Sequence, residues 1–110
     1  MSHHAFPSIN RHWCASSEVT IVDPDGGFEP FYPQYFTVRV TDEAKQVWSG
    51  KVLAVNDSGT LLKLRVTAPQ SFSSAESPDS GALHIQLSYG SREFPSCKMP
   101  VHYVDDNGCG

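Results

Sequence analysis

The sequence predicts an all-β fold, and three observations support this prediction. Short runs rich in β-branched residues alternate between apolar and polar positions, most clearly at residues 61–67 and 82–89. A side-chain period of two is typical of half-buried antiparallel strands. Turn-forming residues separate these runs, and no segment shows the apolar spacing of a helix. About seven such strands favour an immunoglobulin-like antiparallel β-sandwich.

The first half of the chain contains three expected strands, at residues 18–23, 35–41 and 46–55. Residues 24–27 (PDGG) end the first strand, because proline fixes φ and glycine permits positive φ. Residues 28–33 (FEPFYP) are expected to form an irregular connector or an interrupted edge strand, since proline cannot donate to a ladder.

The second half continues the same pattern. A bend or bulge is expected at Ser49-Gly50. A hairpin-type turn at residues 56–59 (NDSG) leads into the strand at residues 61–67. Residues 68–81 are rich in Ser, Pro and Asp, which predicts a loop. The strand at residues 82–89 and a last strand near residues 99–104 then complete the fold.

Length and composition indicate one globular domain. The chain has 110 residues, of which 39% are hydrophobic and 18% are charged, so it can bury a core without a disulfide or metal. We expect a flexible leader at residues 1–15, a single β-sandwich domain at residues 16–105 and a flexible tail at residues 106–110.

The charge balance argues against nucleic acid as the main partner. The net charge is −4, and only 8 Lys and Arg residues are present, whereas phosphate binding requires a concentrated positive field. No apolar run approaches the length that spans a bilayer, so no membrane partner is expected either.

Three cysteines, Cys14, Cys97 and Cys109, bear on the compartment. A secreted disulfide scaffold usually contains an even number of cysteines. We therefore expect reduced thiols and an intracellular location, either cytoplasmic or nuclear. Pairing of Cys14 with Cys97 remains an open alternative.

No catalytic, metal or cofactor motif stands out. His12 with Cys14, or His84 with His102, lacks the paired spacing of zinc ligands. Cys97 and His102 are five residues apart in an extended chain, too far for a nucleophile and its base. The sequence therefore predicts neither an enzyme nor a cofactor or metal site.

Several stretches resemble the TIG domain (also called IPT), an immunoglobulin-like module of transcription factors and plexin-type receptors. They are Val47-Trp48-Ser49 and residues 64–69, 82–94 and 101–104. Filamin-type repeats are similar nearly as closely, with residues 35–40 as one strand and residues 82–104 as the closing hairpin. Either resemblance implies a non-catalytic β-sandwich that is used for association.

The candidate partner-binding residues fall into two groups. An aromatic segment interrupted by prolines could form exposed anchors, which mark protein interfaces, or could close one open end of the sandwich. Outward-facing basic residues could form a strip on one sheet. These candidates are Phe28, Phe31, Tyr32, Tyr35, Arg39, Lys63 and Arg65.

The leading hypothesis is a protein–protein interaction or dimerisation module of a larger protein, such as a transcription regulator or a scaffold. Its partner is a second protein or another copy of the chain. The alternative is a carbohydrate- or ligand-binding sandwich in which Trp48 or Tyr32 stacks on a sugar ring. The strand setting of Trp48 favours its burial. That burial discriminates between the two hypotheses, because a buried indole cannot serve as a stacking platform.

Overall fold

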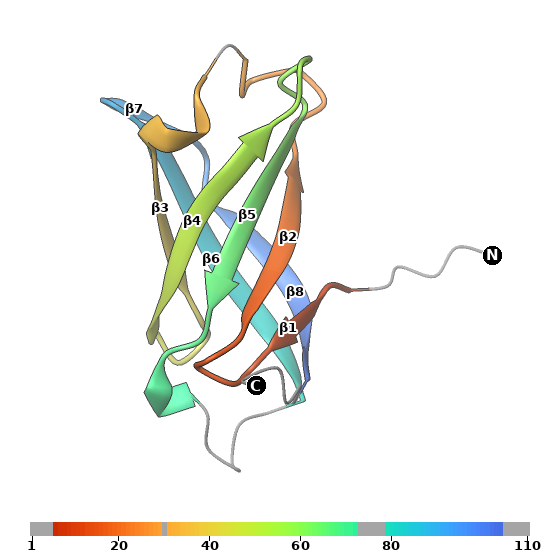
Figure 1. Cartoon of the computed structure of the whole chain (residues 1–110), viewed down its shortest axis with the longest axis vertical. Helices are drawn as coiled ribbons and strands as arrows, with labels where there is room; N and C mark the ends of the chain where they lie inside the picture. The colour runs from red at the N-terminus through yellow and green to blue at the C-terminus, as the bar shows by residue number, and fades with distance from the viewer. Residues whose placement is uncertain (1–5, 30, 73–78, 105–110) are drawn as a thin grey trace, which may run out of the picture.

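The computed structural model describes residues 6–29, 31–72 and 79–104, and within them the fold is all-β (Figure 1). Eight strands form a mixed sheet that is nearly closed into a barrel. Two short 3-10 turns, η1 (Pro33–Tyr35) and η2 (Gln70–Phe72), interrupt the connections. The strands are β1 (Ser8–Asn10), β2 (Ser16–Val22), β3 (Phe36–Thr41), β4 (Val47–Val55), β5 (Leu61–Thr67), β6 (Ser80–Tyr89), β7 (Arg92–Glu93) and β8 (Cys97–Val104).

The strand order is β1-β8-β6-β3-β4-β5-β2, and β7 pairs with β6. All pairs are antiparallel except β1 with β8, which run parallel. The His102 amide donates to the Pro7 carbonyl, and the Arg11 amide donates to the Val104 carbonyl, each at 3.0 Å. The expectation of a wholly antiparallel sheet is therefore wrong, because the chain enters alongside its last strand in the same direction.

Residues 8–10, which the sequence assigns to a leader, form β1. Ile9 is fully buried and Asn10 is buried as well. A strand of three residues is too short to show a side-chain period of two, so its pattern does not distinguish it from a leader. The expected tail at residues 106–110 lies outside the described residues.

The other expected strands are confirmed with small shifts at their ends, and β5 has the predicted bounds. β4 changes partner along its length. Val47 and Trp48 pair with β3, whereas Ser49 and the following residues pair with β5. A Cβ at Gly50 would lie 2.9 Å from a methyl group of Val40, so only glycine fits this crossing without a shift. The register irregularity lies between Val52 and Ala54, not at Ser49-Gly50.

Apolar side chains from both halves of the sheet meet in one core. The strand period of two directs alternate residues inward, as the burial pattern of β5 shows. The largest fully buried side chains are Ile9, Leu62, Leu64, Leu83, Ile85, Val40, Val66 and Val101. No helix in the described part of the chain is long and apolar enough to cross a membrane.

Trp48 is only 3% exposed, so the expectation that its strand setting buries it is confirmed. Its indole Nε1 donates to Asp42 Oδ2 at 3.0 Å, and the Gln46 amide donates to Asp42 Oδ1 at 2.9 Å. The Asp42 carboxylate, itself 3% exposed, therefore holds together the turn between β3 and β4. Its two accepted bonds offset the cost of burying a charge.

Candidate functional site

Five aromatic side chains close one end of the fold, and we call them the aromatic cluster. Phe31 lies 4.4 Å from Tyr89 between ring centroids, and Phe28 lies 5.6 Å from Phe94. Phe36 packs against both Phe31 and Tyr89, at 5.9 and 5.0 Å. Edge and tilted contacts of this kind add to the stabilisation from buried area. The cluster makes this end of the molecule a rigid base.

Arg92 covers part of the aromatic cluster. Its guanidinium carbon lies 5.0 Å from the Phe31 ring centroid and 4.8 Å from that of Phe94. A cation over an aromatic face at these distances is attracted by the ring quadrupole. Arg92 belongs to the short hairpin of β6 and β7, whose turn contains Gly90 at a φ of 60°.

Two tyrosines project from this base, and we call them the tyrosine pair. Tyr32 is 60% exposed and Tyr35 is 62% exposed, although both are large and amphipathic. Their ring centroids lie 6.3 Å apart in an edge-to-face arrangement, and Tyr35 makes the same contact with Tyr89. Pro33 begins η1 between them and fixes the local backbone.

The structure separates the four predicted aromatic residues into two kinds. Phe28 is 3% exposed and belongs to the core, so its assignment as a surface anchor is wrong. Phe31 is partly buried and packs against the core. Of these four residues, only Tyr32 and Tyr35 have most of their surface exposed. Proline interruptions indicate an irregular segment, but they do not show which rings turn inward.

The three predicted basic residues do not form one strip on neighbouring strands. Arg39 lies on β3, whereas Lys63 and Arg65 lie on β5, and β4 runs between these strands. Lys51 on β4 is the direct cross-strand neighbour of Arg65 and extends the basic surface. The Lys63 ammonium lies 3.9 Å from the Glu18 carboxylate, which partly balances the charge. Sequence alternation alone does not show that Lys51 joins this group.

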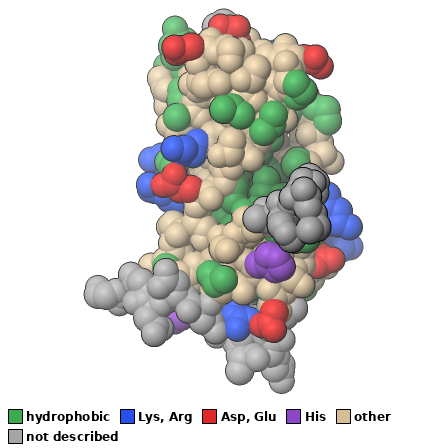
Figure 2. Space-filling view, turned by 90° about the vertical axis from the view of Figure 1, so that its right-hand side faces the viewer, with side chains coloured by type: hydrophobic (Ala, Val, Ile, Leu, Met, Phe, Trp, Pro, Cys, Tyr) green, Lys and Arg blue, Asp and Glu red, His purple; other side chains and the backbone are tan. Residues whose placement is uncertain are grey.

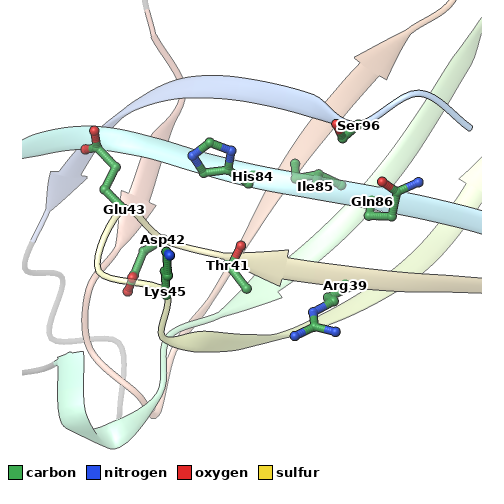
Figure 3. A pocket seen from close by; sticks show the side chains of 9 residues that line it. All are labelled: Arg39, Thr41, Asp42, Glu43, Lys45, His84, Ile85, Gln86 and Ser96. Carbon is green, nitrogen blue, oxygen red and sulfur yellow. The ribbon is translucent and has the colours of Figure 1, made fainter.

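Arg39 lines a different surface, a groove of about 470 Å³ over β3 and β6 (Figure 3). Arg39 and Lys45 contribute positive charge there, while Asp42 and Glu43 contribute negative charge. Asp42 is already engaged by Trp48, and Glu43 Oε1 accepts the Ala82 amide at 3.1 Å. The groove therefore mixes signs of charge, and its acidic groups are already used within the fold.

Cys14 is disulfide-bonded and Cys97 is a free thiol, so these two residues do not pair with each other. The expectation that all thiols are reduced is wrong for Cys14, and Cys109 lies outside the described residues. Cys14 Sγ lies 2.9 Å from His12 Nδ1, but a disulfide sulfur is not a nucleophilic thiolate. Burial raises the pKa of the Cys97 thiol, which lowers its thiolate fraction at neutral pH.

Acidic and histidine side chains do not converge on a common point in the part of the chain that is described. No group of three His, Cys, Asp or Glu residues there could hold a metal ion. Asp23 Oδ1 accepts the Asp25 amide at 3.0 Å, which is the bond of a turn. The Asp23 carboxylate therefore organises the loop after β2.

The strand pattern of the sequence does not single out Tyr89, Arg92 or Lys51 as site residues. Tyr89 and Arg92 flank a two-residue turn. Residues at a strand end beside such a turn lie at the rim of the fold, and this position is the signal that could have identified them. Comparisons with protein-family models, with curated proteins and with solved structures found no match to this chain. The evidence for its function therefore comes from the geometry described above.

Proposed function

We propose that this chain is a non-catalytic protein-interaction module, and that the tyrosine pair is the centre of its contact surface. The observation that carries the proposal is that two tyrosines, each about three-fifths exposed, stand on a rigid aromatic base. Tyrosine is enriched among the residues that dominate binding energy at protein interfaces. Its two side-chain torsions also limit the entropy lost on binding.

The surroundings of the tyrosine pair suit a binding surface. Tyr35 is braced by Tyr89, and the Tyr32 amide lies 3.5 Å from the Tyr89 hydroxyl oxygen. A partner would therefore meet side chains that are already ordered, which reduces the cost of association. Arg92 at the edge of the cluster offers a cation to the polar rim of such an interface.

The fold proposed for this module is an immunoglobulin-like sandwich related to TIG domains or filamin repeats. Antiparallel pairing of β2 with β5, of β3 with β6 and of β6 with β8 supports two layers. The change of partner along β4 supports a strand that passes from one layer to the other. The proposed intracellular location loses its support from reduced thiols, because Cys14 is disulfide-bonded.

The proposal is tested by sedimentation velocity over a concentration series, followed by affinity capture. The test variant is the double substitution Tyr32→Ser with Tyr35→Ser, and the matched control is Val47→Ser. Val47 is 61% exposed on β4, outside the aromatic cluster. Self-association or partner capture that disappears in the test variant and persists in the control supports the proposal. Association that is equal in all three proteins contradicts it.

A carbohydrate-binding sandwich is the second candidate, and it has lost its best platform. Trp48 is buried and its indole Nε1 is bonded to Asp42, so it cannot stack on a sugar ring. Tyr32 remains exposed and keeps this candidate testable. Calorimetric titration with oligosaccharides, repeated on Tyr32→Ser, discriminates between the two: saturable heat that requires the ring supports a sugar ligand.

A further inference from the structure

Among the residues that the structure describes, one edge of β2 carries backbone groups that have no ladder partner. β2 pairs with β5 along its other edge, and the Asp23 amide donates to the Thr60 carbonyl at 2.8 Å. Since N–H and C=O groups of an antiparallel strand point alternately to its two sides, the same alternation directs Glu18, Thr20 and Val22 away from β5. The amides and carbonyls of these three residues therefore face outward along β2.

The edge of β8 lies across from this edge of β2. The Tyr103 amide donates to the Asp79 carbonyl, so the even-numbered residues of β8 face away from β6. β1 covers this edge at His102 and Val104. Above β1, the edge is protected by Pro100, which has no N–H, and by the charge of Lys98. The part of β2 from Glu18 to Val22 contains no proline, and no other strand in the described part of the chain covers it.

A groove of about 360 Å³ lies between these two parts of the sheet, and we call it the β2–β8 groove. Its walls are mostly apolar, and Asp23 and Asp25 are also among its lining residues. Figure 2 views this side of the molecule and shows hydrophobic side chains at the surface in the middle of the face. The apolar lining consists of Ile21, Val22, Phe28, Ile85, Leu87, Phe94, Pro95 and Cys97.

We propose that the β2–β8 groove binds an extended segment of another protein, which adds as a strand to β2 and alternates apolar with basic residues. Between the edges of β2 and β8, the end opposite the groove already holds a strand. There β1 lies beside β8, and the Asn10 amide donates to Ser17 Oγ on β2. An added strand would occupy the gap between β2 and β8 beyond β1. Its main chain pairs with Thr20 and Val22, and its inward side chains enter the apolar groove.

Charge selects the outward side chains of the ligand. The charged residues that line the groove are Asp23 and Asp25, and Glu18 and Lys98 lie further along β2 and β8. The Arg92 guanidinium also lies at this end of the groove, 4.8 Å from the ring centroid of the lining residue Phe94. Lys63 partly balances Glu18, at 3.9 Å, whereas both charged residues of the lining itself are carboxylates. Val22 and its cross-strand neighbour Leu61 are 62% and 42% exposed. A lysine of the ligand can lie with its stem on this apolar pair and its ammonium near the acidic loop.

This inference goes beyond the proposed function, because neither Tyr32 nor Tyr35 lines the groove, although Phe28 and Phe94 of the aromatic cluster do. The tyrosine pair stands on η1 and the turn of β6 and β7, whereas pairing in the groove uses β2. A variant of the tyrosine pair therefore leaves the groove intact. The two proposals can fail separately.

The test uses an acetylated and amidated octapeptide that alternates valine and lysine, titrated into the full chain and followed by calorimetry and amide NMR. We expect saturable binding with shifts centred on the amides of Thr20 and Val22. Thr20→Pro should weaken binding at least about tenfold, because it deletes an outward N–H without removing a bond to β5. Thr20→Val keeps the N–H and is the matched control, with binding unchanged.

Further arms keep the proposal falsifiable if Thr20→Pro does not fold. A peptide N-methylated along one edge cannot pair with β2 by that edge and should lose binding when that edge is used. Two peptides, each N-methylated along a different edge, therefore test for strand addition without any change to the protein. Equal affinity of both N-methylated peptides and the parent peptide would overturn the proposal.

Other outcomes overturn particular parts of it. If a valine–glutamate peptide binds as tightly as the valine–lysine peptide, the charge selection is wrong. If Thr20→Pro abolishes self-association in sedimentation while no peptide binds, the occupant is a second copy and not a foreign strand. Binding that survives in Tyr32→Ser with Tyr35→Ser supports the separation of the two surfaces, and loss in that variant contradicts it.

Discussion

Replacing Asp42 tests the account of the turn between β3 and β4. The carboxylate is 3% exposed and accepts bonds from the Trp48 indole and the Gln46 amide. Asp42→Ala leaves the buried indole N–H without this acceptor, which costs about 1–3 kcal/mol. Loss of the bond from the turn amide adds about 0.5–1.5 kcal/mol. The expected decrease in the free energy of unfolding is therefore about 1.5–4.5 kcal/mol.

The measurement is equilibrium urea denaturation, followed by far-ultraviolet circular dichroism and by tryptophan fluorescence. Asp42→Asn is the control, because its single amide oxygen can keep one of the two bonds. We expect its loss of stability to be about half that of Asp42→Ala. A double-mutant cycle with Trp48→Phe isolates the indole bond.

Two results would refute this reasoning. A loss below about 0.5 kcal/mol for Asp42→Ala would place that position among ordinary surface substitutions. Additive losses in the cycle with Trp48→Phe would show that the indole and the carboxylate do not stabilise each other. Either result would mean that the turn is held by other contacts.

Three further predictions concern other positions. Burial, followed by the charges of Asp42 and Glu43, raises the pKa of Tyr103 from 10.0 to about 12. The stability of the protein relative to Tyr103→Phe should therefore be constant below pH 10 and should fall as pH rises from 10 toward 12, measured by denaturation at each pH. Lys45 has a φ of 64°, so Lys45→Gly should stabilise the turn by up to about 1 kcal/mol in the same assay, and a loss would contradict the strain argument. Ile9 is fully buried on β1, so Ile9→Ala should cost about 2–5 kcal/mol, whereas a negligible cost would show that β1 does not contribute to the core.

The sequence predicts the strands whose alternation runs for six or more residues. β5 and β6 have a clear period of two because one of their faces packs on the core. β1 has only three residues and β7 only two, and such lengths leave no period to detect. The parallel pairing of β1 also follows from long-range contacts with β8, which no local pattern encodes.

The candidate surfaces were harder to predict because they combine distant segments. The aromatic cluster brings Phe31 together with Tyr89 and Phe94, which lie 58 and 63 residues further along the chain. The basic residues could be assigned to outward faces, but their neighbours depend on strand order. Only the register places Lys51 beside Arg65 and separates both from Arg39.

The change of partner along β4 has a consequence for local unfolding. The pairs of β4 with β3 are Val40 with Trp48 and Thr41 with Val47, so the ladder between these strands is short. β2, β5 and the rest of β4 share a much longer ladder. Amide hydrogen exchange should therefore report two cooperative units, with β2, β4 and β5 opening separately from β3, β6 and β8. Trp48 lies at the boundary between the two units. Asp42→Ala should therefore uncouple their hydrogen exchange while both units remain folded.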